Sequence, residues 1–222
     1  MNLDDLEPAR RDALLSGAKR VRLGRGEPAY NPGDRADRVY FVRSGRVKIV
    51  RTSPSGAESI VGIRTAGDVF GELTGAAEGV RSTSAVAIEP VEADAVAAAA
   101  FRAALERDPA VARAFARGVT RRLAAAEHEL AELMGKSVAG RLVDVLGRLA
   151  AEHGVPEDGA VRIGINLTHK DLADLIGTSR ETLTKELSVL ADVGLLRVAH
   201  KTITLVQPQA FPFAVRPAGI RP

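Results

Sequence analysis

The chain has 222 residues, of which 45% are apolar and 27% charged, with a formal net charge of +3. This composition predicts one or two ordinary globular domains. The sequence contains no cysteine, which excludes a disulfide framework, a cysteine-held iron–sulfur cluster, a thiolate zinc site and a cysteine nucleophile. The four histidines (His128, His153, His169 and His200) are far apart, so we expect no metal site.

The longest stretch without a charged residue or histidine is 202–215, which is too short for a membrane helix and contains two prolines. The N-terminus is acidic where a signal peptide would be basic. We therefore expect a soluble, cytoplasmic protein without membrane association.

Residues 21–96 have the pattern of short β-strands. β-branched residues are frequent in 39–43, 46–50 and 59–63, and Gly33, Gly45, Gly56 and Gly67 follow at intervals of twelve, eleven and eleven residues. Turn signals at this spacing predict a sandwich or barrel of antiparallel strands.

From Ala97 the pattern becomes helical. Asp108-Pro109 is typical of an N-cap followed by proline in the first turn, and no further proline occurs before Gly135. The segment predicts a helix of about 25 residues, or about 37 Å. Its apolar positions are Val111, Phe115, Val119, Leu123, Ala126, Leu130 and Leu133. From Leu123 onward they follow the spacing of a coiled-coil seam, and this ridge belongs either to the helix's own domain or to a dimer interface.

The segment 136–222 predicts helices, a short strand at 161–165 and a hairpin over 195–206 that turns at His200-Lys201. A turn-rich stretch at 154–159 follows the first helix, and the last sixteen residues, with four prolines, are expected to be irregular. Two further helices between Thr168 and Ala191 are separated at Gly177.

These two helices carry the strongest motif. Thr168 and Asp171 have capping-box spacing, Gly177 permits a left-handed turn, and Ser179 caps the second helix. The pattern favours a winged helix-turn-helix over a simple αα-hairpin, because Arg180, Glu181 and Lys185 can contact base edges and phosphate. The candidate DNA-binding residues are Thr168, His169, Lys170, Ser179, Arg180, Glu181, Thr182 and Lys185.

A second motif is Phe70-Gly-Glu-Leu73, followed by Arg81-Ser-Thr83. Gly71 lets backbone N–H groups approach an anion, Arg81 offers a forked cation for a phosphodiester, and Glu72 suits a ribose hydroxyl. Each piece taken alone is also compatible with a purely structural role.

With these motifs, residues 20–206 resemble the cyclic-AMP receptor protein/FNR (CRP/FNR) family of bacterial transcription regulators. The resemblance implies an α+β protein with an antiparallel β-roll domain (1–107), a long dimerisation helix (108–135) and a winged helix-turn-helix domain (136–222). It also implies a homodimer that binds double-stranded DNA at an inverted repeat close to TGTGA and acts with RNA polymerase.

The resemblance implies a cyclic-nucleotide site at Gly71, Glu72, Leu73, Arg81, Ser82, Thr83 and Glu127. In cyclic-AMP responders, a Thr-Ser pair stands where this chain has Ala126-Glu127. Cyclic AMP is therefore the expected ligand, and cyclic GMP is not excluded because Glu127 can accept from either purine. The lack of cysteine, and the position of all histidines after the β-roll, argue against iron–sulfur and haem cofactors.

The expected function is a ligand-responsive transcription regulator and not an enzyme. One alternative is a family member that binds DNA without a nucleotide and keeps a vestigial pocket. A second, from another class, is an enzyme using Glu72, Arg81 and His128, but the sequence offers it no nucleophile–base pair.

Overall fold

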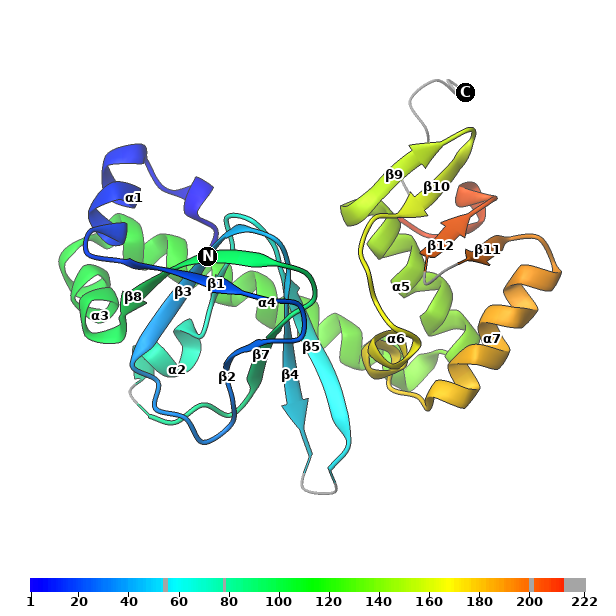
Figure 1. The fold of residues 1–222 in the computed structure, drawn as a ribbon, viewed down its shortest axis with the longest axis horizontal. Helices are drawn as coiled ribbons and strands as arrows, with labels where there is room; N and C mark the ends of the chain where they lie inside the picture. Colours follow the sequence, from blue (N-terminus) through cyan, green and yellow to red (C-terminus); the bar gives the residue numbers. More distant parts are fainter. Residues whose placement is uncertain (54–55, 78, 200–201, 214–222) are drawn as a thin grey trace. The chain divides into compact units, whose positions relative to one another are not determined.

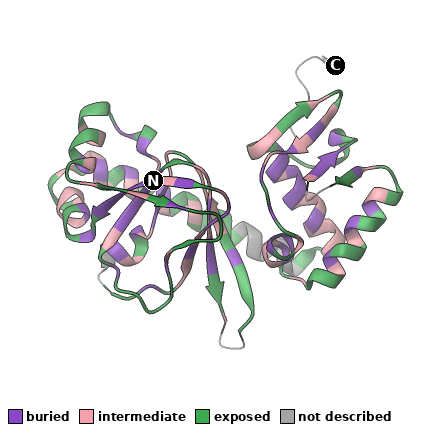
Figure 2. Cartoon of the chain, viewed as in Figure 1, coloured by how far each residue is buried: buried purple, intermediate pink, exposed green. Residues whose placement is uncertain are grey.

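The computed structural model describes residues 1–53, 56–77, 79–199 and 202–213, with the backbone alone at residues 76–77 and 128–134. The chain forms two compact units, residues 1–127 and 128–222 (Figure 1). No helix in the described ranges combines the length and apolar character needed to cross a bilayer. Buried residues line the inner faces of the elements in each unit (Figure 2).

The N-terminal unit is an antiparallel β-roll flanked by helices. Its strands form two four-stranded sheets, in the orders β1-β8-β3-β6 and β2-β7-β4-β5. The strands are β1 (Lys19–Leu23), β2 (Pro28–Tyr30), β3 (Arg38–Ser44), β4 (Val47–Thr52), β5 (Glu58–Arg64), β6 (Val69–Phe70), β7 (Ser84–Ala87) and β8 (Val91–Ala97). The helices are η1 (Leu3–Asp5), α1 (Pro8–Leu15), α2 (Glu72–Ala77), α3 (Ala98–Arg107) and α4 (Pro109–Gly135).

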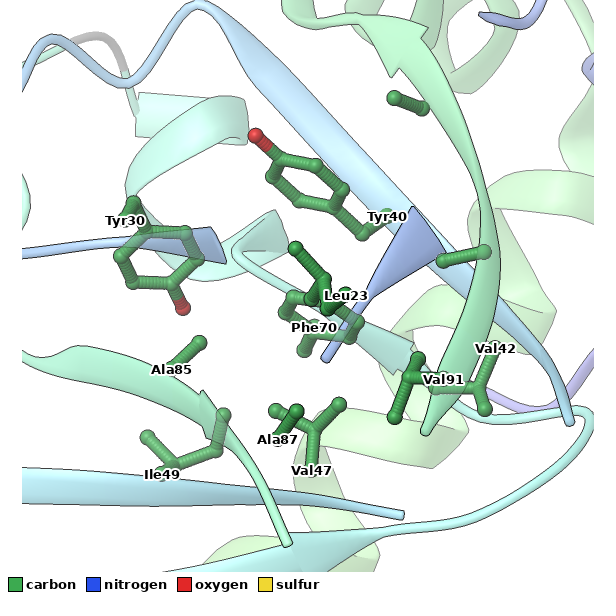
Figure 3. Packing of buried hydrophobic residues seen from close by; sticks show 12 residues of the cluster. Leu23, Tyr30, Tyr40, Val42, Val47, Ile49, Phe70, Ala85, Ala87 and Val91 are labelled. Atoms are coloured by element: carbon green, nitrogen blue, oxygen red, sulfur yellow. The ribbon is translucent and has the colours of Figure 1, made fainter. Parts of the chain in front are cut away.

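Side chains of strand β3 alternate between two hydrophobic cores, one on each face of the strand. Tyr40 and Val42 point between the two sheets, where the rings of Tyr40 and Phe70 stack with centroids 4.9 Å apart (Figure 3). Val39 and Phe41 point to the other face, which is covered by α1, α3 and the start of α4. A strand buried on both faces is apolar throughout, which explains the continuous run Val39–Val42.

Helix α4 begins as the sequence predicts. Asp108 Oδ1 accepts a hydrogen bond from the Ala110 amide at 2.8 Å, and the helix continues for 27 residues to Gly135. Val111 and Ala114 are buried in the β-roll's own core, whereas Leu123 is 58% exposed. The first part of the apolar ridge therefore packs into the core of the β-roll, whereas Leu123 in its later part is exposed. The side chains of Leu130 and Leu133 lie outside the described residues.

The C-terminal unit contains three helices, a four-stranded sheet and a short 3-10 turn in its described part. The sheet order is β11-β12-β10-β9. The elements are α5 (Val138–His153), β9 (Gly154–Glu157), β10 (Ala160–Ile163), α6 (His169–Ile176), α7 (Arg180–Asp192), β11 (Leu196–Ala199), β12 (Thr202–Leu205) and η2 (Pro208–Ala210). The expected hairpin 195–206 is present as β11 and β12, while its predicted turn at His200-Lys201 lies outside the described residues.

One strand of this unit was not predicted. Residues 154–157 form strand β9, which pairs antiparallel with Ala160–Ile163. The turn is confined to Asp158-Gly159, where both residues have positive φ (43° and 82°). Proline and glycine are uncommon in strands, so the composition of this stretch did not predict one, and the strand depends on pairing with its neighbour.

Candidate nucleotide pocket and DNA-binding surface

The Gly71 turn and Arg81 form the centre of the first candidate site. Gly71 has a φ of 74°, and a Cβ built there would lie 2.9 Å from Arg81 Nη1 and 3.2 Å from the Tyr30 ring. Glycine therefore permits both the turn and the close approach of the guanidinium. Strand β6 ends at Phe70 immediately before this turn, and α2 begins at Glu72 immediately after it.

Arg81 is fixed by its backbone and its side chain. The Arg81 amide donates to Asp34 O at 2.8 Å, and the Gly33 amide donates to Arg81 O at 2.9 Å. The buried guanidinium donates from Nη1 to Gly71 O at 2.6 Å and to Thr74 Oγ1 at 2.9 Å, and from Nη2 to the carbonyl oxygen of Arg38. Its central carbon also lies 4.2 Å from the Tyr30 ring centroid, which is a cation–π distance.

Glu72 is the buried carboxylate of the site. It is 2% exposed, and its Oε1 forms an ion pair with Nη1 of Arg122 from α4. The ion pair is close but poorly aligned, because Oε1 has no hydrogen bond of acceptable geometry. A contact between α2 and α4 thus links the turn to the long helix.

Arg64, at the end of β5, adds another cation to the pocket. It pairs in register with Val47, a fully buried residue of β4. Its Nη1 donates to Ile63 O at 3.0 Å. Burial lowers the pKa of Arg64, and the neighbouring charge of Arg122 acts in the same direction.

The cluster is incompletely satisfied. Among the described residues, the buried side-chain polar atoms without a hydrogen-bond partner are Arg64 Nε, Glu72 Oε1, Arg81 Nε and Arg122 Nη2. All four belong to this one group of side chains. Because buried polar atoms are nearly always paired, their convergence makes this group of side chains a candidate binding site.

Tyr30 borders the same group. Burial raises the pKa of its phenol, while the charge of Arg81 and a hydrogen bond with Thr83 oppose that rise. The charges of Arg81, Glu72 and Arg64 all act on this one phenol.

The structure brings together only part of the predicted nucleotide site. Gly71, Glu72 and Arg81 converge, and Thr83 reaches the group through Tyr30. Leu73 is 57% exposed and Ser82 is also exposed. Glu127 is exposed on α4, five residues after Arg122, and this spacing turns it about 140° around the helix from the pocket-facing arginine.

Sequence reasoning missed Arg64, Arg122 and Tyr30. Arg122 flanks the apolar ridge of α4 in the sequence, and the structure shows that it faces Glu72. Its spacing on the helix gave no signal for this role, because its partner is 50 residues away in the sequence. Arg64 directly follows the short apolar run 60–63, and this is a signal that could have been noticed.

The second candidate site is the helix-turn-helix. Thr168 and Asp171 form the predicted capping box, with the Asp171 amide donating to Thr168 Oγ1 at 3.1 Å and the Thr168 amide donating to Asp171 Oδ2 at 2.9 Å. Gly177 has a φ of 64° and ends α6, as predicted. Ser179 caps α7 by accepting from the Thr182 amide at 3.2 Å.

Helix α7 is divided into a buried and an exposed face. Leu183, Leu187 and Leu190 are buried. The exposed residues include Ser179, Arg180, Glu181 and Lys185, and Thr182 is half-buried. A hydrogen bond to its own amide and a second to Ser179 lower the pKa of Glu181, so this side chain is an acceptor at neutral pH.

The candidate DNA-binding residues at the start of α6, before the turn at Gly177, already contact other protein groups. Thr168 is exposed but accepts the capping hydrogen bond. His169 Nδ1 lies 3.3 Å from Thr184 Oγ1, and Lys170 Nζ donates to Asp174 Oδ2 at 2.8 Å along its own helix. Asp174 thus offsets the charge of Lys170 at this surface.

Arg141 of α5 holds the turn of the motif. Its Nε donates to Ile176 O at 2.9 Å and its Nη2 to Gly177 O at 3.5 Å, while Nη1 reaches Lys136 O at 3.0 Å. The first two carbonyls are those that the end of α6 leaves without a helical partner. Arg141 therefore fixes the position of the turn, and with it the start of α7, relative to α5.

The folds of the two units, a β-roll and a winged helix-turn-helix, are those of a class of DNA-binding transcription regulators. Residues 20–108 match the family model of the cyclic nucleotide-binding domain, and residues 140–211 match that of the Crp-like helix-turn-helix domain.

A "CRP-like cAMP-activated global transcriptional regulator" of Mycobacterium tuberculosis is 34% identical over 90% of this chain and 89% of its own length. A "Global nitrogen regulator" of Synechococcus elongatus is 33% identical over 84% of this chain and 85% of its own. Among solved structures, the c-di-GMP responsive global regulator CLP of Xanthomonas campestris matches in fold with a TM-score of 0.81 at 23% identity, covering 90% of this chain and 99% of that one.

The chain belongs to the CRP/FNR family of transcription regulators. This confirms the predicted family and the α+β fold class. The relatives named above are regulators and not enzymes. Among the described residues, no group of three or more His, Asp or Glu side chains could hold a metal ion.

Proposed function

We propose that this protein is a homodimeric transcription regulator whose binding to an inverted-repeat DNA site is controlled by a cyclic nucleotide, with cyclic AMP as the first candidate. The observation that carries the ligand is that two buried polar atoms beside the Gly71 turn, Glu72 Oε1 and Arg81 Nε, have no hydrogen-bond partner. Gly71, Glu72 and Arg81 lie in the segment that matches the cyclic nucleotide-binding domain.

The chemistry of the pocket supports a phosphodiester and a ribose. Arg81 retains an unpartnered Nε beside a glycine turn, and a forked cation at such a turn suits a monoanionic phosphate. Glu72 Oε1 is ion-paired with Arg122 but accepts no hydrogen bond, so it can accept one from a ribose hydroxyl. The purine end is less defined, because Glu127 lies exposed on another side of α4.

The names of relatives support cyclic AMP and also mark the alternatives. The mycobacterial relative is called cAMP-activated, the cyanobacterial one carries no nucleotide in its name, and the Xanthomonas regulator responds to c-di-GMP. A regulator with a vestigial pocket therefore remains the second candidate, favoured by Ala126-Glu127 where cyclic-AMP responders have Thr-Ser.

The DNA-binding part of the proposal rests on the exposed start of α7. Arg180 can pair with guanine, Glu181 can accept from a cytosine amino group, and Lys185 can reach a base or a phosphate. Two copies joined along α4 would present two such helices, which is the arrangement that reads an inverted repeat. RNA polymerase is the proposed protein partner and the cytoplasm the proposed location, since transcription regulation takes place there.

The test combines calorimetry with DNA binding. The full chain is titrated with cyclic AMP, cyclic GMP and c-di-GMP, and its affinity for a labelled inverted repeat of TGTGA is measured with and without each ligand. Saturable binding of cyclic AMP that tightens DNA binding at least tenfold supports the proposal. No nucleotide binding at millimolar ligand, with DNA bound equally well throughout, supports the vestigial pocket.

A further inference from the structure

A small cavity of about 130 Å³ lies next to Arg122, on the side of α4 that packs against β5 and β6. Its lining residues are Met1, Arg64, Asp68, Val69, Gly118, Arg121 and Arg122. A water molecule occupies about 30 Å³ in the liquid, so the cavity has room for one small polyatomic ion. The function proposed above makes no use of this space.

The charges around the cavity are unevenly compensated. Arg121 pairs with Asp5 at 2.9 Å. Asp68 accepts from the amide and the hydroxyl of Thr65 at 2.9 and 3.1 Å, and also from Asn2 at 3.4 Å. Asp68 is therefore hydrogen-bonded by neutral donors and forms no ion pair with either remaining guanidinium, although its charge also acts on Arg64.

Those two guanidiniums are Arg64 and Arg122. Arg122 uses Nη1 for Glu72 and directs Nε toward Gly118 O at 3.4 Å, which leaves Nη2 unpartnered. Arg64 donates to the carbonyl oxygen of Ile63, and its Nε is unpartnered. Among the described residues, Arg122 is ion-paired with Glu72 and Arg64 has no ion-pair partner, and a buried cation without a counter-charge is costly.

The local sequence makes room for Arg64. A Cβ built on Gly62 would lie 2.7 Å from Arg64 Nη1 and 3.3 Å from Nη2. Glycine two positions earlier on the strand therefore allows the guanidinium to fold back into the roll, where it meets Arg122.

We propose that Arg64 and Arg122 form a second anion site, which binds a phosphate-type oxyanion through Arg64 Nε and Arg122 Nη2. Two guanidiniums with unpartnered N–H groups match the acceptor capacity of a tetrahedral oxyanion. The anion is either free inorganic phosphate or the second phosphate of a nucleotide whose first phosphate lies at Arg81. The second source rests on the proposed function, whereas the site itself does not.

Arg122 couples the two sites, because its Nη1 contacts Glu72 in the nucleotide pocket and its Nη2 belongs to the anion site. An anion that draws Arg122 away from Glu72 changes the carboxylate proposed for the ribose. Occupancy of one site therefore alters affinity at the other, and the coupling is reciprocal.

The experiment titrates inorganic phosphate into the full chain by calorimetry at constant ionic strength, with chloride as the replaced ion, and follows the unfolding temperature in parallel. The variants are Arg64→Met and, as a matched loss of one arginine, Arg51→Met on the exposed part of neighbouring strand β4. Gly62→Ala is added because it displaces the Arg64 guanidinium without removing its charge.

We expect phosphate to bind and stabilise the wild type and Arg51→Met. Arg64→Met should lose at least about tenfold in phosphate affinity, equivalent to about 1.4 kcal/mol, and Gly62→Ala should also lose affinity. Without phosphate, Arg64→Met should unfold at the same temperature as wild type or higher, because it removes an uncompensated cation. Equal phosphate affinity in wild type and Arg64→Met would overturn the site.

A second arm separates the two sources of the anion. If c-di-GMP binds in competition with phosphate and depends on Arg64, while cyclic AMP does not, the ligand supplies the anion. If phosphate and cyclic AMP bind together and change each other's affinity, the anion is free phosphate. Arg64-dependent phosphate binding in a protein that binds no nucleotide would support the anion site and contradict the proposed function. No saturable phosphate binding below about 10 mM and no Arg64 dependence for any nucleotide would refute the inference.

Discussion

Arg81 Nη1 lies 2.6 Å from the carbonyl oxygen of Gly71, and this hydrogen bond ties together the two motifs of the candidate pocket. The same guanidinium reaches Thr74 and the carbonyl oxygen of Arg38. Arg81 therefore closes the turn before α2 as well as offering Nε to a ligand. Loss of Arg81 has a structural and a binding consequence, and a charge-conserving variant is needed to see both.

We expect Arg81→Lys to weaken cyclic-nucleotide binding at least about tenfold and to lower the free energy of unfolding by about 1–3 kcal/mol. Lysine keeps the charge but cannot make the forked contacts. Calorimetry and urea denaturation measure the two effects. Arg46→Lys is the matched control, because Arg46 contacts Glu89 at 3.0 and 3.1 Å outside the pocket. Unchanged nucleotide affinity in Arg81→Lys would remove Arg81 from the site.

The Glu72–Arg122 pair should behave as a coupled unit. Glu72→Gln leaves Arg122 without its carboxylate and should cost about 2–3 kcal/mol of unfolding free energy, less than for a fully buried pair, since the Arg122 side chain is 28% exposed. The double variant with Arg122→Met should recover part of this loss. A double-mutant cycle in urea measures the coupling.

The exposed pair Arg22–Glu92, at 2.8 Å with side chains 79% and 37% exposed, is the reference for that cycle. Its coupling free energy should stay below about 1 kcal/mol. Additive effects of Glu72→Gln and Arg122→Met would show that the contact between α2 and α4 contributes nothing.

Leu123→Glu should convert a dimer to a monomer. Leu123 is 58% exposed in the single chain and begins the seam-like spacing of α4. In a dimer, the substitution would place two carboxylates against each other. Analytical ultracentrifugation at tens of micromolar reports the mass, with Val193→Glu as a control at an equally exposed apolar position (60%) of the C-terminal unit. A monomeric wild type would contradict the dimer and the reading of an inverted repeat.

Arg141→Met should loosen the turn of the helix-turn-helix without changing the β-roll. Loss of charge-assisted hydrogen bonds to Ile176 O and Gly177 O should destabilise the C-terminal unit by about 2 kcal/mol. Hydrogen exchange in 177–180 should become faster and DNA affinity should fall, while nucleotide affinity is retained. Arg162→Met, which removes an ion pair with Glu157 in the same unit, should leave exchange in the turn unchanged.

Arg180→Ala and Lys185→Ala should have different effects on DNA binding: the first on sequence selectivity, the second on affinity for all sequences. Loss of a bidentate contact to guanine should cost about 1–3 kcal/mol and relax preference at one base pair. Loss of a phosphate contact should weaken all sequences alike and flatten the salt dependence. Selection from a random DNA library distinguishes the two. An asymmetric consensus, or full selectivity in Arg180→Ala, would contradict the proposed reading.

Local chemistry in the sequence predicted the features that depend on near neighbours. The capping box Thr168–Asp171, the left-handed Gly177, the Ser179 cap and the start of α4 at Asp108 are all present, because each involves residues within a few positions. The glycine-punctuated β pattern and the buried leucines of α7 were predictable for the same reason.

The sequence by itself therefore determined the family, the order of β-roll, long helix and helix-turn-helix, and Gly71, Glu72 and Arg81 as a group. Only the tertiary structure decided that Arg122 faces Glu72, that Arg64 joins them, that Arg141 holds the turn after α6, and that β9 is a strand. The three arginine positions depend on contacts between elements that are far apart in the sequence, and β9 depends on pairing with a neighbouring strand. The periodicity of short sequence segments does not predict such contacts. The buried atoms of the pocket that lack a hydrogen-bond partner could be identified only from the folded structure, because the sequence does not show which polar atoms are shielded from water.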